Sequence, residues 1–155
     1  MTISKFCLVI NGHSIDQSSL SCTGYQLSKL MRILELKKSK IYWYACDIEV
    51  VDNVNYWLEF DGWRPRLLGN YLNKKKAIEN TSQFLSGVFL GVLGNHDFVW
   101  RDEYSTEDPP FGEIEAALLQ IRAFDTTNFE IYSANQSILN EIRIAYGGKI
   151  KHCTI

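Results

Sequence analysis

The part of the chain from Leu118 to Tyr146 constrains the fold most, because three local signals follow one another in it. Apolar and polar residues alternate from Leu119 to Ala123 and again from Phe129 to Tyr132, which is the period of a half-buried strand. Asp125 to Thr127 stand between the two segments and are typical of a turn. The stretch therefore predicts an antiparallel hairpin.

The length of the turn decides which side chains share a face of this hairpin. With a connection of three residues, Ile121 lies opposite Ile131, and one face of the hairpin is apolar. The same register places Arg122 opposite Glu130, so the other face carries matched charges. A connection of even length would mix the two faces. We therefore predict the three-residue register.

A helix is predicted directly after the hairpin. Asn135 or Ser133 can accept a hydrogen bond from the free N–H groups of its first turn. One helical face carries the apolar residues Ile138, Leu139, Ile142, Ala145 and Tyr146. Gly147 and Gly148 end the helix, because glycine adopts the left-handed conformation of a helix C-terminus at little cost.

The rest of the chain supplies further strands and two more helices. Strands are predicted over residues 3–11, 40–51, 56–60, 87–93 and 149–155, the last as a short edge strand. Helices are predicted over residues 25–38, with Ser21 or Thr23 as the cap, and over residues 71–84. Because hairpins outnumber parallel crossovers, we expect residues 1–155 to form a single α+β domain, a mainly antiparallel sheet with two or three helices on one face.

Residues 40–51 form the longest predicted strand. Strict alternation assigns its side chains to two faces. One face would carry Tyr42, Tyr44, Cys46, Ile48 and Val50, and the other Trp43, Ala45, Asp47 and Glu49. A turn at Asp52 and Asn53 would join this strand to the predicted strand 56–60.

Composition restricts the class of protein. A chain of 155 residues with 46% hydrophobic and 22% charged residues is typical of a soluble globular domain that buries its own core. No apolar run is long enough to cross a bilayer, and the first residues lack the pattern of a secretion signal, so we expect a cytoplasmic protein without membrane contact. The four cysteines are scattered and form no CxxC pair, which favours reduced structural thiols and no bound cofactor or metal.

Charge is concentrated in one irregular stretch, residues 94–112 and the residues just after it. Between Asp97 and Glu115 there are seven acidic residues and one basic residue, Arg101. The acids are Asp97, Asp102, Glu103, Glu107, Asp108, Glu113 and Glu115. Trp100, Tyr104 and Phe111 are interleaved with them. Aromatic anchors beside negative charges suit the recognition of a basic protein surface, although a solvated loop with its rings folded inward would have the same sequence.

The segment Gly94-Asn95-His96-Asp97 offers a catalytic alternative. It resembles the GNHD segment of calcineurin-like metallophosphoesterases, and this resemblance implies a metal-dependent hydrolase with Asn95 and His96 at a two-metal centre. A site of that kind needs several further ligands. The chain has neither the early Asp-x-His nor the Gly-Asp pair of that family, and His13 and His152 stand alone.

The composition bears on nucleic-acid binding, and the tryptophans bear on small-ligand binding. The basic clusters Lys37-Lys38 and Lys74–Lys76 are short, and the sequence pI is 5.9, so we expect no nucleic acid as partner. A small-ligand pocket lined by Trp43, Trp57 and Trp63 is a further alternative to a protein partner, although packing in the core or at its edge is the expected role of these aromatic residues.

Residues 121–133, IRAFDTTNFEIYS, and the helix after them resemble the C-terminal part of small bacterial α+β proteins of the immunity type. That resemblance implies a non-enzymatic protein that neutralises a cognate bacterial toxin with a basic surface, such as a nuclease, by occluding its active surface. The predicted partner contacts are Trp100, Asp102, Glu103, Tyr104, Glu107 and Asp108.

Overall fold

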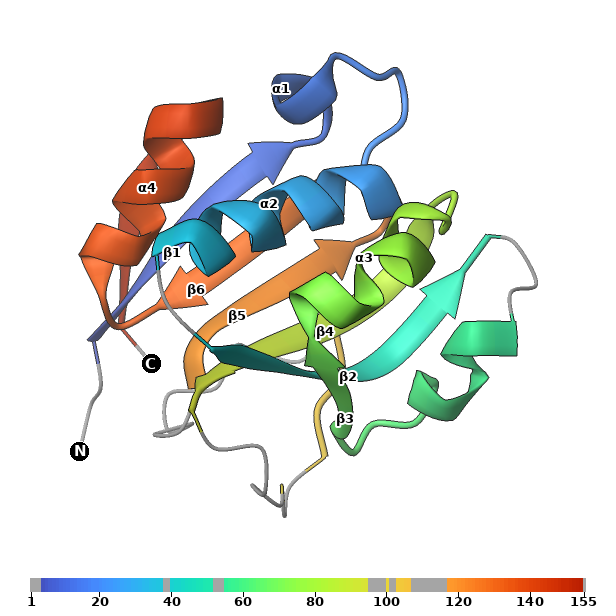
Figure 1. Ribbon diagram of the computed structural model, residues 1–155. Coiled ribbons are helices and arrows are strands. Elements are labelled where there is room, and N and C mark those ends of the chain that lie inside the picture. Colours follow the sequence, from blue (N-terminus) through green and yellow to red (C-terminus); the bar gives the residue numbers. More distant parts are fainter. Residues whose placement is uncertain are drawn as a thin grey trace.

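The computed structural model describes residues 4–37, 40–51, 55–94, 100, 103–106 and 117–154. In these residues seven strands form one antiparallel sheet with the order β3-β2-β4-β5-β6-β1-β7 (Figure 1). The strands are β1 (Ser4–Asn11), β2 (Ile41–Val50), β3 (Arg66–Asn70), β4 (Phe84–Leu93), β5 (Ala117–Phe124), β6 (Asn128–Ser133) and β7 (Ile150–Thr154). The predicted α+β class and mainly antiparallel sheet are confirmed.

The helices gather on one face of this sheet. They are α1 (His13–Asp16), α2 (Gly24–Lys37), α3 (Tyr71–Glu79) and α4 (Gln136–Tyr146), together with the 3-10 helix η1 (Asn55–Phe60). Figure 1 shows α2, α3 and α4 lying across the same side of the strands. We call this side the helix face and the other side the opposite face. Within the described residues no helix has the length and apolar character needed to cross a bilayer.

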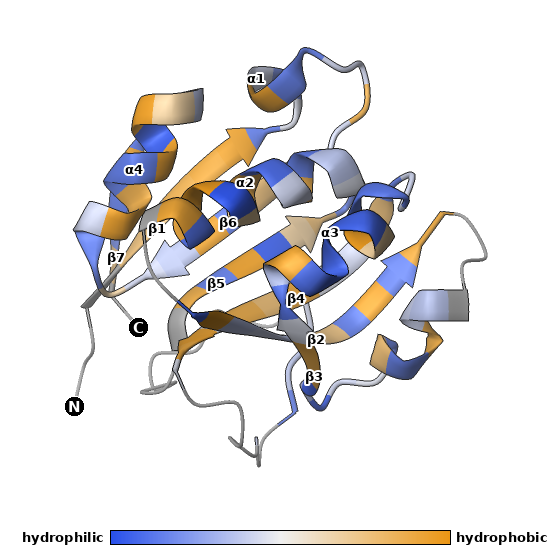
Figure 2. Cartoon of the chain, in the orientation of Figure 1, coloured by the Kyte–Doolittle hydropathy of each residue, from blue (hydrophilic) through white to orange (hydrophobic). Residues whose placement is uncertain are grey.

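The main core lies between the helix face and the helices. The buried residues Leu27, Leu30, Met31 and Leu34 of α2 and Ile138, Leu139 and Ile142 of α4 pack in it against the strands. Hydrophobic and hydrophilic residues alternate along both helices in Figure 2, as expected when one side of a helix is buried and the other is solvated. Ala145 was predicted on the buried side of α4 but is exposed.

The predicted hairpin is present in the predicted register. Ile121 pairs with Ile131, and Arg122 pairs with Glu130. The turn closes with a hydrogen bond of 3.0 Å from the Thr127 N–H to the Phe124 carbonyl. Asn135 caps α4 by accepting a hydrogen bond from the Ser137 N–H, and Gly147 ends the helix with a φ of 82°. Local sequence patterns were therefore sufficient to define this region.

The N-terminus of α2 is held by a reciprocal pair of hydrogen bonds. The Gln26 N–H donates to the Thr23 Oγ1 at 3.1 Å, and the Thr23 N–H donates to the Gln26 Oε1 at 3.1 Å. This is a capping box, which satisfies two N–H groups that the helix itself leaves without partners. Of the two predicted caps, Thr23 is the one that performs this role.

Replacing Thr23 with alanine is expected to lower the free energy of unfolding by about 1 kcal/mol, because the hydroxyl that accepts the Gln26 N–H is lost. Urea unfolding followed by circular dichroism measures the change. Thr23→Ser keeps the hydroxyl and should restore most of the stability, whereas Ser19→Ala removes an exposed hydroxyl and serves as the control. If Thr23→Ala and Ser19→Ala had equal free energies of unfolding, the capping box would contribute nothing to the stability of the protein.

Two sequence predictions next to β2 are wrong. Residues 56–60 form η1 rather than a strand, and the neighbour of β2 at the edge of the sheet is β3. Aromatic residues favoured a strand, yet in a 3-10 helix residues three apart lie above one another, so Trp57 and Phe60 both reach the main core.

The helix predicted over residues 71–84 is present but shorter than predicted. α3 ends at Glu79, and β4 begins at Phe84.

The predicted division of β2 into two faces fails from Asp47 onward, because Asp47 itself lies on the opposite face with Thr106. The backbone of Asp47 has a φ of 52°, and the pairing with β4 shifts between Cys46 and Glu49. A bulge of this kind moves every following side chain to the other face. Ile48 therefore joins Trp43 and Ala45 in the main core, instead of lying with Tyr44 and Cys46 as predicted.

Candidate functional site

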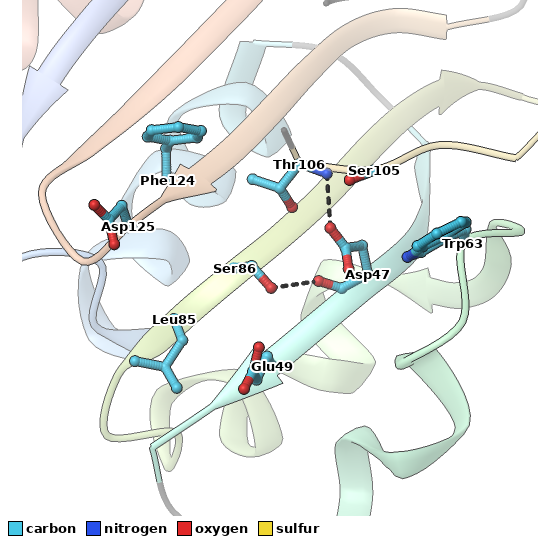
Figure 3. Close-up of a pocket in the computed structure, with 9 residues that line it drawn as sticks. All are labelled: Asp47, Glu49, Trp63, Leu85, Ser86, Ser105, Thr106, Phe124 and Asp125. Carbon is cyan, nitrogen blue, oxygen red and sulfur yellow. Dashed lines mark hydrogen bonds between the residues drawn. The ribbon is translucent and has the colours of Figure 1, made fainter. Parts of the chain in front are cut away.

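The bulge at Asp47 is the centre of a polar arrangement on the opposite face. Its Oδ2 accepts a hydrogen bond of 2.7 Å from the Thr106 N–H, and its main-chain carbonyl accepts one of 2.8 Å from the Ser86 Oγ (Figure 3). Its own N–H donates to the Gly62 carbonyl at 2.7 Å. Asp47 thus joins β2 to β4 and to two irregular segments, and its carboxylate has a fixed position.

A pocket of about 480 Å³ opens beside Asp47. Its walls come from β2, β4, the turn after β5, and the segments that contain Trp63 and Thr106. The lining residues are Asp47, Glu49, Trp63, Leu85, Ser86, Ser105, Thr106, Phe124 and Asp125. Figure 3 shows Trp63 and Phe124 on opposite sides of the pocket with Asp47 and Ser86 between them.

The charge of this pocket has one sign. Asp47, Glu49 and Asp125 line it, and none of the nine lining residues, all in the described part of the chain, is basic. Among the described residues, no three His, Cys, Asp or Glu side chains lie close enough together to hold a metal ion. The arrangement offers acceptors to an ammonium or guanidinium group.

Apolar surface accompanies the charge. Trp63 is 57% exposed, and Phe124 and Leu85 are also exposed at the edges of the pocket. A large exposed ring next to carboxylates is the arrangement that binds the aliphatic stem and the cationic head of a lysine or arginine side chain. The pocket therefore suits a basic group that belongs to a protein.

The structure corrects the predicted role of two aromatic residues in the acidic stretch. Trp100 and Tyr104 were expected to project as anchors for a partner, but each is only 4% exposed. Their rings lie edge to face with centroids 5.9 Å apart, and Trp100 also meets Tyr44 at 5.7 Å. They form a second core on the opposite face with Cys46, Val88, Leu90 and Val92. Side chains buried in this way are not available as surface contacts.

The acidic contacts predicted from the same stretch are only partly within the described residues. Glu103 is exposed, two positions before Ser105, which lines the pocket. Asp102, Glu107 and Asp108 lie outside the described residues, and their contact with a partner stays a prediction. Of the predicted contacts that lie within the described residues, Glu103 is the one that is exposed.

The catalytic alternative also falls largely outside the described residues. Gly94 directly follows β4 and has a φ of 67°, whereas Asn95, His96 and Asp97 lie outside the described residues. A hydrolytic site at this turn stays a prediction. The alternative ligand pocket is wrong as proposed, because Trp43 and Trp57 are buried in the main core while Trp63 is exposed.

Most of the pocket was missed by sequence reasoning. Glu49, Asp125 and Trp63 are far apart in the sequence and belong to three different local patterns. The available signal was the acid Asp47 between the apolar residues Cys46 and Ile48 of a strand, since a carboxylate there needs a partner or a bulge that turns it outward. In the comparisons with known proteins, no family model, no curated protein and no solved structure matches the chain.

Proposed function

We propose that the protein is a non-enzymatic binding protein of the immunity type, which neutralises a cognate bacterial toxin by covering the toxin's active surface. The observation that carries this proposal is the acidic pocket beside Asp47. Its three carboxylates, with no basic residue among the lining side chains, attract a cationic group. Trp63 stands exposed at the same pocket, and tryptophan is among the residues that most often dominate the energy of a protein interface.

A toxin with a basic active surface fits this pocket best. A lysine or arginine side chain of the toxin would place its cationic head among the carboxylates of Glu49, Asp125 and Asp47, with its stem against Trp63. Nucleases belong to this class, because they bind the phosphate backbone through lysine and arginine. Covering those residues excludes the substrate without any chemical step by the inhibitor.

The exposed acid Glu103 extends the proposed surface beyond the pocket. Asp102, Glu107 and Asp108 are proposed as further contacts with the partner. Charges at the rim of an interface mainly accelerate association, whereas buried aromatic contacts slow dissociation. In this proposal, Trp63 takes the anchoring role that the sequence had assigned to Trp100 and Tyr104.

Changes in the pocket are expected to weaken binding in two distinct ways. Trp63→Ala should raise the Kd at least about 30-fold, which corresponds to a hot spot of about 2 kcal/mol. The double variant Glu49→Gln and Asp125→Asn keeps the shape of the pocket but removes two charges, so it should slow association several-fold and reduce its dependence on salt. Asp47 is left unchanged, because its carboxylate accepts the Thr106 N–H.

The experiment needs a defined partner and matched controls. The chain is immobilised, and a protein that it retains from a lysate of its native cells is identified and purified. That partner is assayed for toxin activity with and without the chain. Surface plasmon resonance then measures the rates of association and dissociation. Leu58→Ala and Glu59→Gln on η1 are the controls, since Leu58 is 57% exposed like Trp63 and neither residue lines the pocket. Wild-type binding by all pocket variants would mean that this surface is wrong. A partner that stays fully active when saturated with the chain would contradict neutralisation.

A further inference from the structure

Two of the four cysteines lie together on the opposite face, near the edge of the sheet. In the pairing of β1 with β7, Cys7 stands opposite Lys151, and Cys153 stands opposite Lys5. Because residues two apart on a strand share a face, Cys7 and Cys153 are diagonal neighbours on one face. Cys153 is near enough to Cys7 to contribute to the raised pKa of the Cys7 thiol, and both cysteines are free thiols.

The surroundings make the two thiols unequal. Cys7 is buried, and its burial raises the pKa of its thiol to about 11. Tyr132 stands opposite Cys7 on β6, contacts its thiol, and donates from its hydroxyl to the Glu130 Oε2 at 2.8 Å. Cys153 is only partly buried. A reagent in solution therefore meets the partly buried Cys153 first, with the buried Cys7 beside it on the neighbouring strand.

We propose that Cys7 and Cys153 form a redox modification site, at which a small disulfide joins the first strand of the sheet to the last. Cys153 loses its proton to water, and its thiolate attacks one sulfur of the small disulfide. The S–S bond breaks, and the small thiolate that leaves takes up a proton from water. The sulfur of Cys7 then attacks the Cys153 sulfur of this mixed disulfide, and the second small thiol leaves with the Cys7 proton. Two electrons pass from the two protein thiols to the small disulfide, which is reduced to two thiols.

Because β7 lies at the edge of the sheet, the link would hold this edge strand in place. β7 is an edge strand, paired only with β1 among the described strands. A diagonal cysteine pair needs a shift of the backbone before its sulfurs reach bonding geometry, and an edge strand can make that shift because it is paired on one side only. Once formed, the link holds β7 to β1 covalently and opposes fraying of the edge.

The other two cysteines lack such a partner in the described residues. Cys22 is buried and its Sγ donates to the Asn128 carbonyl at 3.2 Å, while Cys46 lies in the second core beneath Tyr104. Burial raises the pKa of Cys22 to about 11 and the pKa of Cys46 to about 12. The pKa of Cys7 is raised in the same way, so the feature that sets Cys22 and Cys46 apart is that neither has a neighbouring cysteine among the groups that shift its pKa. Oxidation should therefore be confined to the pair on β1 and β7.

Oxidised glutathione added to the reduced full-length chain tests the proposal. The expected product is a monomer that has lost two of its four thiols, in which mass spectrometry finds the peptide with Cys7 linked to the peptide with Cys153, reversibly with dithiothreitol. Hydrogen exchange of the β7 amides should slow by roughly an order of magnitude on oxidation. This site is independent of the proposed toxin-binding surface.

Two variants distinguish this outcome from others. Cys153→Ser should abolish the link and leave Cys7 unmodified, whereas Cys22→Ala should still form the link. A stable mixed disulfide of Cys153 with glutathione, or a link between two copies of the chain, would overturn the proposed site. A link within one chain that left the exchange of β7 unchanged would overturn its role in holding the edge strand.

Discussion

Replacing Arg122 with alanine is expected to lower the free energy of unfolding by about 3 to 5 kcal/mol, because a buried charged group that holds other buried groups is lost. Arg122 is only 2% exposed. Its Nη1 donates to the Thr106 carbonyl at 3.0 Å, and its Nε donates to the Gln120 Oε1 at 3.2 Å. Alanine would leave both acceptors without this donor and would open a cavity under the segment that contains Thr106.

Urea unfolding followed by tryptophan fluorescence measures this loss. The matched control is Arg143→Ala on α4, where the side chain is exposed and its Nε donates to the Asn140 Oδ1 at 3.3 Å. That control should change the free energy of unfolding by no more than about 0.5 kcal/mol. Arg122→Lys should fall between the two, since lysine keeps the charge but loses the planar set of donors. Equal stabilities of Arg122→Ala and Arg143→Ala would mean that Arg122 does not hold this segment.

Arg122 shows which features of the structure could be predicted from the sequence and which could not. The spacing of the hairpin placed it opposite Glu130, and that pairing is observed. The same spacing could not reveal that its face of the hairpin is covered, because Thr106 comes from a distant and irregular segment. Local period predicts which side chains share a face, but burial of a face depends on segments that have no period of their own.

The aromatic residues of the acidic stretch show the same difficulty in another form. A large ring between charges can anchor a partner or fold onto the domain, and the sequence leaves both open. Burying a ring of about 150 to 250 Å² removes apolar area from water at about 25 cal/mol per Å², which favours the inward choice wherever the body of the protein offers space. Val88 and Leu90 of β4 offer that space on the opposite face, and Trp100 and Tyr104 pack there.

The candidate pocket depends on an irregularity that alternation hides. Strict alternation would have placed Asp47 beside Trp43 and Ala45, which are in the main core. An unpaired carboxylate in a core is costly, and the bulge with its positive φ avoids that cost by turning Asp47 toward Thr106. An acid that breaks an apolar strand is therefore a usable signal for a bulge, although it does not identify the other walls of the pocket.

Replacing Trp57 with alanine is expected to lower the free energy of unfolding by about 3 to 5 kcal/mol, because its indole fills the main core where η1 meets the sheet. Trp57 is 2% exposed, and its ring lies edge to face with those of Phe84 at 5.3 Å and Phe60 at 5.7 Å between centroids. Its Nε1 donates to the Thr81 Oγ1 at 2.8 Å. The Thr81 hydroxyl donates in turn to the Ala77 carbonyl at 3.1 Å, so the indole also ties η1 to the end of α3.

Thermal and urea unfolding of three variants separate packing from the hydrogen bond. Trp57→Phe keeps an aromatic ring but removes the N–H, so it should lose less than Trp57→Ala, with about 1 kcal/mol of its loss due to the hydrogen bond. Trp63→Ala makes the same chemical change at a side chain that is 57% exposed and should stay within about 0.5 kcal/mol of the wild type. If Trp57→Ala were no less stable than Trp63→Ala, η1 would not be packed on the sheet as described. If Trp57→Phe were as unstable as Trp57→Ala, the hydrogen bond to Thr81 rather than the packing would hold η1 in place.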